Sequence, residues 1–294
     1  MLLTNRSFIL KDYKNYDVES RKVLLFEESD CDTLLEKFYS DVLEAVDKKK
    51  HFPIIRIADG EFQFLLGKNE LNLRKPIVTL VRNLLGELLR TISGRNFEAR
   101  SRTYTSGVYN TSDQAHVYAG YSECLKYVAD NGILALYTLI KPNFYTEQYL
   151  PRLFDFFENN DIAVDSSNYI PFYFVYIILT NKRYSKIYQN KCVHLITSFN
   201  NTRKESIERS LFSLGVRSIS WTNISRDKSL FDVIDIDSID KSTDVVFVGA
   251  GVGKVNIFNQ LKDFPAVVID AGYIFEIWQE PQLSKERDYC IPHE

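Results

Sequence analysis

The sequence predicts an α/β protein with a Rossmann-like, mostly parallel sheet that is flanked by helices. The last third of the chain carries the clearest pattern, because short apolar runs there alternate with single amphipathic segments. Such alternation is typical of parallel βαβ units. A second observation is that polar or glycine-rich turns follow several of these runs. Ligands of parallel α/β sheets bind beyond the carboxyl ends of the strands, so these turns are the places to look for a site.

The first half of the chain is expected to contain helices around one short strand. A helix is predicted over 32–50, with Asp32 as its N-cap, followed by a buried strand over 53–57. A second helix is expected to start at Glu61 and to stop near Gly67. The remaining segments are a helix over 76–92, a strand or extended loop over 99–110, and a helix over 112–131.

The second half supplies most of the expected sheet. A strand is predicted at 133–139 and a helix at 146–160, whereas the apolar run 169–179 fits either a buried helix or a strand. Further strands are expected at 191–197, 216–221, 244–249 and 266–270, with helices at 203–215 and 254–264. The stretch 223–243 has no clear period and is interpreted as the loosest part of the chain.

Composition excludes several classes of protein. The 294 residues are 45% hydrophobic and 26% charged, with a formal net charge of −3, so nothing indicates a nucleic-acid-binding protein. The four cysteines form no C-x-x-C pair, and no Cys/His cluster has zinc spacing. No signal-peptide core and no apolar run of roughly 18 residues is present. We expect one cytoplasmic domain over 1–294 without a transmembrane segment; association with a membrane surface and homo-oligomer formation stay open.

Two carboxylates stand where the first strand ends, in the sequence Arg56-Ile57-Ala58-Asp59-Gly60-Glu61. Residues two apart in extended backbone point the same way, so Asp59 and Glu61 could converge on one hard cation such as Mg²⁺ or Mn²⁺. Gly60 permits close approach of a ligand. Asp59 as an N-cap is the ordinary alternative. Arg56 argues against a purely structural reading, because an arginine within an apolar strand needs an anionic partner.

The loop after 191–197 is a second candidate site. Ser198, Asn200 and Asn201 offer hydroxyl and amide groups just before a helix N-terminus, which is favourable for an anion. Helix capping is the alternative reading of the same residues.

A glycine-rich turn after 244–249 is the third candidate. Gly249, Gly251 and Gly253 let a phosphate, ribose or base approach the backbone, although the turn lacks P-loop spacing. Asp270 ends the next strand, and Tyr273 and Glu276 follow it with side chains suited to a sugar or base site. The turn together with Asp270 also suits the donor pocket of a methyltransferase or a dinucleotide site.

Two other features are interpreted as unrelated to a site. Asp235-Ile236-Asp237 resembles the metal-binding D-x-D of many sugar transferases, but it lies in the loose stretch without a preceding strand. His194 lies within an apolar strand, where packing is the simpler role.

The first motif and the C-terminal segment together resemble the GT-D-fold glycosyltransferases. The stretch "IIRIADGEF" is similar to the R-x-G-D-G-E motif of that family, and "DVVFVGAGVGKVNIFNQLKDFPAVVIDAGYIFEIW" is similar to its closing segment. The stretch "VHLITSFNNTR" resembles the family's middle strand and loop. The matched pieces span roughly residues 50–280 in the family's order. Three positions depart from it: Ala58 replaces a Gly, Gly251-Val252 replaces Gly-Pro, and Tyr273 stands where the family commonly has His.

The resemblance implies a hexosyl- or pentosyltransferase of polysaccharide biosynthesis that uses a nucleotide-diphosphate sugar, with a UDP-sugar expected, and a glycan or glycoconjugate acceptor. It implies that Asp59 and Glu61 bind Mn²⁺ or Mg²⁺, that Arg56 is the motif's arginine, and that the nucleotide-binding part lies within 191–280, after a helical lead-in over 1–50. Glu61 and Glu276 are both candidates for the catalytic base. An S-adenosylmethionine-dependent methyltransferase and a non-catalytic glycan-binding domain are the alternatives.

Overall fold

The described residues of the computed structural model fall into several ranges along the chain. They are residues 31–57, 61, 111–136, 153, 156–165, 167–226 and 228–286. The predicted helices after Glu61 and over 76–92, and the predicted segment 99–110, lie outside these ranges. So do Ala58, Asp59 and Gly60, which make up half of the first motif.

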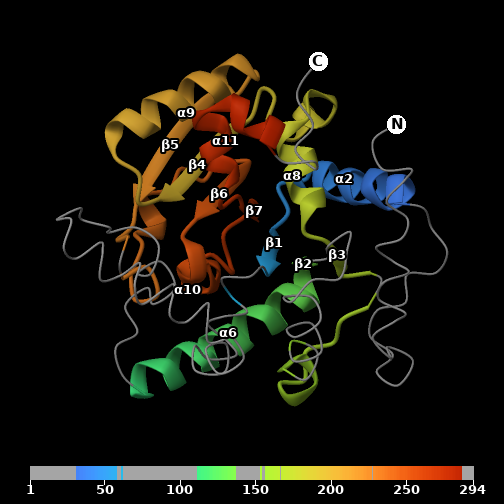
Figure 1. Ribbon diagram of the computed structural model, residues 1–294, viewed down its shortest axis with the longest axis vertical. Coiled ribbons are helices and arrows are strands. Elements are labelled where there is room, and N and C mark those ends of the chain that lie inside the picture. Colours follow the sequence, from blue (N-terminus) through green and yellow to red (C-terminus); the bar gives the residue numbers. More distant parts are fainter. Residues whose placement is uncertain are drawn as a thin grey trace, which may run out of the picture.

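A seven-stranded sheet in which every pair of neighbours is parallel forms the centre of the described structure (Figure 1). Its spatial order is β3-β2-β1-β7-β6-β4-β5. The strands are β1 (Phe52–Ile57), β2 (Ile133–Leu136), β3 (Tyr169–Pro171), β4 (Cys192–Thr197), β5 (Ser218–Asn223), β6 (Val245–Gly249) and β7 (Val267–Asp270). The predicted α/β fold with a parallel sheet is therefore confirmed.

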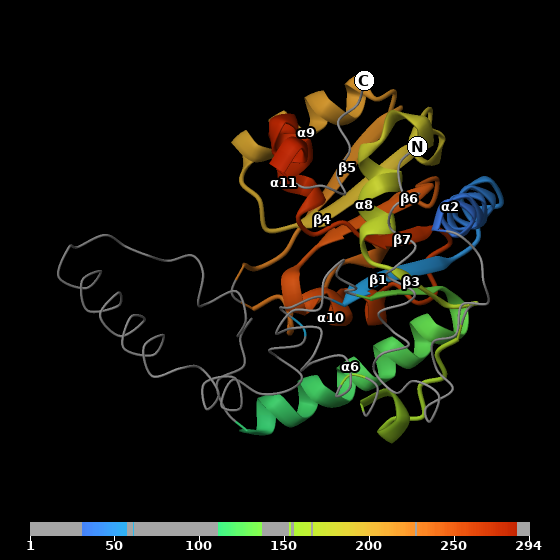
Figure 2. The ribbon, with the colours of Figure 1, turned by 45° about the vertical axis from the view of Figure 1, so that its right-hand side comes forward.

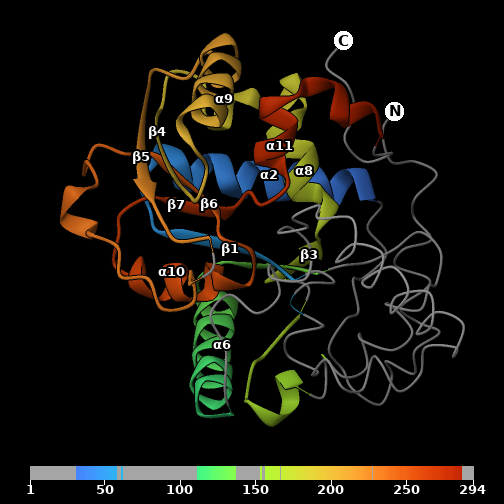
Figure 3. The ribbon, with the colours of Figure 1, turned by 60° about the vertical axis from the view of Figure 1, so that its left-hand side comes forward.

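Helices cover both faces of the sheet (Figures 2 and 3). On one face lie α2 (Cys31–Asp47), α8 (Tyr173–Thr180), α9 (Asn201–Ser213) and α11 (Ile274–Gln279), and on the other lie α6 (Thr111–Asn131) and α10 (Lys254–Gln260). Right-handed crossovers explain this division, because the chain moves outward from β4 to β5 but back toward the centre from β6 to β7. Of the helices in the described part, none combines the length and hydropathy needed to cross a membrane.

Burial explains why the strands are apolar throughout instead of alternating. In β2, β3 and β7 every residue is buried, as expected for a parallel sheet covered on both faces. The edge strand β5 is different, since its residues are exposed or half-buried and its sequence is rich in hydroxyl side chains.

The apolar run 169–179, whose pattern fits either a strand or a buried helix, contains one of each. Tyr169–Pro171 forms strand β3, and Tyr173–Thr180 forms the fully buried helix α8. The helix expected over 254–264 is shorter, because α10 ends at Gln260. Four short 3₁₀ helices occur in the described part of the chain, of which η4 directly precedes α10: η2 (Lys182–Ile187), η3 (Ile236–Ser238), η4 (Gly251–Gly253) and η5 (Pro281–Glu286).

The stretch 223–243 is packed against the fold, and its description as loose was wrong for the residues that are described. Ile224, Leu230, Ile234 and Ile239 are buried. Side-chain amides of α10 also hold its backbone, for instance the Gln260 amide, which donates to a carbonyl of this stretch at 2.8 Å. These contacts come from a distant helix, so no local period signals them.

His194 on β4 occupies a structural position, as predicted. Its two ring nitrogens lie 2.7 and 2.9 Å from the hydroxyl oxygens of Ser220 and Thr222 on β5. Burial lowers the pKa of His194 to about 4.

This pKa predicts an acid-dependent loss of stability. The unfolded chain binds a proton near pH 6.5 and the folded chain only near pH 4, so stability falls as pH drops through this window. At pH 5 the cost relative to pH 8 is about 2 kcal/mol. Chemical denaturation at both pH values should show that His194→Gln removes about this much of the difference between them. An unchanged difference would contradict the assignment.

Candidate functional site

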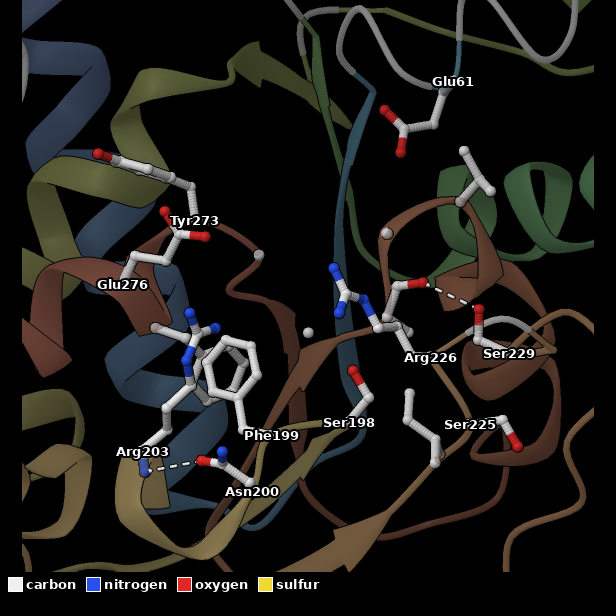
Figure 4. Close-up of a pocket in the computed structure, with 17 residues that line it drawn as sticks. Glu61, Ser198, Phe199, Asn200, Arg203, Ser225, Arg226, Ser229, Tyr273 and Glu276 are labelled. Atoms are coloured by element: carbon white, nitrogen blue, oxygen red, sulfur yellow. Dashed lines mark hydrogen bonds between the residues drawn. The ribbon is translucent and has the colours of Figure 1, made fainter. Parts of the chain in front are cut away.

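A pocket of about 820 Å³ opens at the edge of the sheet where the parallel strands end (Figure 4). Its walls come from the loops that follow β4, β5, β6 and β7, and Glu61 contributes from beyond β1. Its volume is in the range of pockets that bind small molecules and cofactors. The lining residues are Glu61, Ser198, Phe199, Asn200, Arg203, Ile224, Ser225, Arg226, Ser229, Gly249, Ala250, Gly251, Val252, Gly272, Tyr273, Phe275 and Glu276.

The loop after β4 contributes both polar groups and a cation. Ser198 and Asn200, which the sequence indicated as nucleotide-binding residues, line the pocket, whereas Asn201 does not belong to the lining. The Asn200 side-chain oxygen accepts a hydrogen bond from the Arg203 backbone N–H at 3.1 Å, so Asn200 caps α9 and faces the pocket at once. The Arg203 guanidinium lies 4.9 Å from the centre of the Phe199 ring.

The glycine-rich turn after β6 forms a second wall. Gly249 and Gly251 line the pocket, and Gly251 has a φ of +55° with no atom within 4 Å of where a Cβ would lie. Backbone conformation, not crowding, therefore requires glycine there. Gly253 does not belong to the pocket lining, and a Cβ at this position would lie 2.1 Å from the hydroxyl oxygen of the lining residue Ser229, so close packing requires glycine there.

The third wall, after β5, was not identified from the sequence. Ser225, Arg226 and Ser229 line the pocket there, and Figure 4 shows the Arg226 side chain directed into it. The Ser229 hydroxyl donates to the carbonyl oxygen of Ala250 at 3.2 Å, which joins this wall to the glycine turn. These residues follow the carboxyl end of a strand, and that position could have indicated them. The segment contains no recognisable motif, so they were not identified.

Tyr273 and Glu276, whose side chains the sequence indicated for a sugar or base site, complete the pocket on the side of α11. Figure 4 shows the Glu276 carboxylate beside Tyr273, on the same side of the pocket as Arg203. Glu276 is exposed, so its carboxylate is accessible to a ligand and to water.

A buried cluster of four charges lies under the pocket. Arg56 on β1 donates to Asp270 on β7, with Nη2 at 3.1 Å from Oδ1 and Nε at 2.8 Å from the backbone carbonyl oxygen. The Lys254 ammonium at the start of α10 lies 2.6 Å from Asp270 Oδ2 and 2.9 Å from Glu61 Oε1. The Arg56 guanidinium also lies 4.8 Å from the ring centre of Tyr176.

Three of these groups, Arg56, Lys254 and Asp270, hold each other in their ionised forms. Burial alone would raise the pKa of the Asp270 carboxyl group, but Arg56 and Lys254 outweigh it and lower that pKa. Burial would likewise lower the pKa of Lys254, but Asp270 and Glu61 raise it above its ordinary value. Arg56 and Asp270 thus satisfy each other, which explains the arginine within an apolar strand. Neither of the two residues belongs to the pocket lining.

The described residues fit a divalent metal poorly. Glu61 is paired with Lys254, and the described part of the chain contains no group of three or more His, Cys, Asp or Glu side chains arranged to bind a metal. Asp59, the other expected ligand, lies outside the described residues. Asp235 and Asp237 are exposed near η3 and do not line the pocket.

Fold and site together define an α/β protein with a pocket at the carboxyl edge of a parallel sheet. Among solved structures, the chain is similar to one described as a new glycosyltransferase (DUF1792) from Streptococcus sanguinis, with 13% sequence identity over 83% of each chain and a TM-score of 0.48. A likeness this distant carries no argument about function. No family model matches the sequence, and no curated protein matches it significantly.

Proposed function

We propose that this protein is a glycosyltransferase that moves a hexosyl or pentosyl group from a nucleotide-diphosphate sugar to a glycan or glycoconjugate acceptor. The observation that carries the proposal is the meeting of Glu61, the Ser198–Arg203 loop and the glycine turn around one pocket. These are the three segments whose sequences resemble the GT-D-fold glycosyltransferases. A pocket of about 820 Å³ also has room for a nucleotide with a sugar.

The charges that face the pocket favour an anionic donor. Arg203 and Arg226 offer guanidinium groups, which bind phosphate oxygens through paired hydrogen bonds. Glu61 lines the same pocket, but Lys254 neutralises it. Phe199 and Tyr273 add aromatic rings on which a base or a sugar can pack. A UDP-sugar is the donor that we propose.

Glu276 is the better placed of the two candidate bases. Glu61 is 5% exposed and ion-paired, whereas Glu276 is exposed at the pocket. In a direct displacement the Glu276 carboxylate would take the proton of the acceptor hydroxyl. At the same time the oxygen of that hydroxyl would form a bond to the anomeric carbon of the donor sugar. The bond from that carbon to the diphosphate breaks, and the diphosphate leaves with the electron pair while the two arginines stabilise its charge.

The metal predicted from Asp59 and Glu61 stays a prediction and takes part in none of these steps. The methyltransferase alternative loses support from the position of Asp270. That carboxylate, which would bind the donor in such an enzyme, is 2% exposed and held by Arg56 and Lys254 beneath the pocket.

Thermal unfolding with a panel of ligands tests the proposed class. UDP, GDP and S-adenosylmethionine are added separately, and the melting temperature Tm is recorded for each. A ligand at about 100 times its Kd stabilises the folded state by about 2.7 kcal/mol, which corresponds to a shift of several degrees. We expect a shift with UDP or GDP and none with S-adenosylmethionine. A shift with S-adenosylmethionine alone would overturn the proposal.

A further inference from the structure

The ammonium group of Lys254 is fully used within the fold. Besides Asp270 Oδ2 and Glu61 Oε1, it donates to the backbone carbonyl oxygen of Arg56. An ammonium group has three N–H donors, and here it donates to two oxygens and is ion-paired with a third, the Oε1 of Glu61. Lys254 is 4% exposed, so its position is fixed by these contacts and by the surrounding packing.

The three oxygens around Lys254 are of the kind that binds a hard divalent cation. Two carboxylates and one backbone carbonyl converge on a single point, and Mg²⁺, Mn²⁺ and Ca²⁺ prefer these ligand types. The three ligands come from the end of β1, the segment just beyond it and the end of β7, which is the edge of the sheet where the pocket opens.

We propose that Lys254 is a built-in cation that takes the position of a divalent metal among Glu61, Asp270 and the Arg56 carbonyl group, so that the nucleotide diphosphate binds without metal. The proposal rests on the proposed function and specifies its donor site.

Lys254 neutralises the negative charge of Glu61 at the pocket. Glu61 lines the pocket, and an unpaired carboxylate there would repel a diphosphate. With Lys254 at 2.9 Å, the pair presents no net charge, and the net positive charge for phosphate oxygens comes from Arg203 and Arg226. A metal would neutralise the same carboxylate only when bound, whereas Lys254 does so in every molecule.

Binding of UDP to the wild-type protein is the first arm of the test. Calorimetric titrations are run in a buffer with EDTA and in one with excess Mn²⁺. We expect Kd values that agree within about twofold, because no metal takes part. A Kd more than about tenfold lower with Mn²⁺ would overturn the inference while leaving the proposed function intact.

Direct binding of Mn²⁺ without nucleotide is the second arm, and it uses the wild type, Lys254→Ala and Lys262→Ala. Removal of the ammonium leaves three oxygens around a vacant position, so Lys254→Ala is expected to bind Mn²⁺ and to gain thermal stability from it. Lys262, which pairs with Glu123 at 2.6 Å on the surface, is the matched control and should gain neither property. Saturable binding of Mn²⁺ by the wild type with Kd below about 100 μM would contradict the inference.

The two arms separate the possible failures. If Lys254→Ala does not fold, the wild-type measurements still decide, because both report on the intact cluster. If no nucleoside diphosphate binds under either condition, the proposed function fails, and the Mn²⁺ arm still supports or overturns the role of Lys254 as a built-in cation.

Discussion

Replacement of Asp270 by alanine is expected to lower the free energy of unfolding by about 3–5 kcal/mol, because it leaves buried cations without their partner. Both cations lose the Asp270 carboxylate, which lies 3.1 Å from Arg56 Nη2 and 2.6 Å from Lys254 Nζ. Glu61 remains as a partner of Lys254, and Arg56 keeps its contact with the Tyr176 ring, which carries no full charge. Urea denaturation followed by circular dichroism measures the change.

Asp41→Ala is the matched control for this prediction. Asp41 pairs with Lys37 at 2.9 Å on the surface of α2, where the Lys37 and Asp41 side chains are 65% and 41% exposed. Pairs of this kind contribute about 0.3–0.5 kcal/mol, so the control should barely differ from the wild type. If Asp270→Ala were as mild as Asp41→Ala, the buried cluster would not have the energetic role assigned to it.

Replacement of Arg226 by glutamate is expected to weaken the binding of UDP roughly a hundredfold. The substitution removes a guanidinium directed into the pocket and puts a carboxylate in its place, so that a charge-assisted hydrogen bond is replaced by repulsion. Arg226 is exposed, and the fold should tolerate the change. Isothermal titration calorimetry gives the Kd, and denaturation gives the stability.

Arg209→Glu is the control for Arg226. Arg209 lies on the exposed side of α9, where it contacts Glu205 and Ser206, and it does not line the pocket. The same change of charge there should leave the Kd within about twofold. Equal weakening by both substitutions would mean that overall charge, and not a phosphate contact of Arg226, governs binding.

Local patterns made most of the sheet predictable. The strands that became β4, β6 and β7 are β-branched runs that end in polar or glycine-rich turns, and their ends were placed within one or two residues. The run 169–179 could not be assigned because a fully buried helix and a buried strand are both apolar on all sides. Its division after Pro171 follows from packing against β2.

The site was predicted where side chains follow a strand within a recognisable turn. Ser198, Gly251 and Tyr273 were found in this way. Arg226 was missed because it lies in a segment that distant side-chain contacts hold in place. Lys254 was missed as a member of the cluster, since its acceptor at Arg56 lies 198 positions away and only the sheet order brings β1 beside β7.

The structure changed the interpretation of the Arg56–Glu61 motif most, because it shows that Lys254 contacts Glu61. Two acids beside a strand end suggested a metal, but one of them, Glu61, is neutralised by Lys254 in the fold. Pairing of this kind depends on long-range contacts, and neither spacing nor composition reveals it. Asp59 lies outside the described residues, and the comparison of UDP binding in EDTA and in Mn²⁺ decides between a metal and Lys254.

Release of UDP from UDP-sugars tests the central claim most directly. The protein is incubated with a panel of UDP-hexoses and UDP-pentoses, with and without simple sugar acceptors, and free UDP is quantified. We predict that one donor yields UDP, that an acceptor accelerates its release, and that Arg226→Glu and Glu276→Gln each reduce it strongly. If no nucleotide sugar in the panel yields UDP, and none protects the protein against thermal unfolding, the assignment as a transferase of UDP-sugars is contradicted.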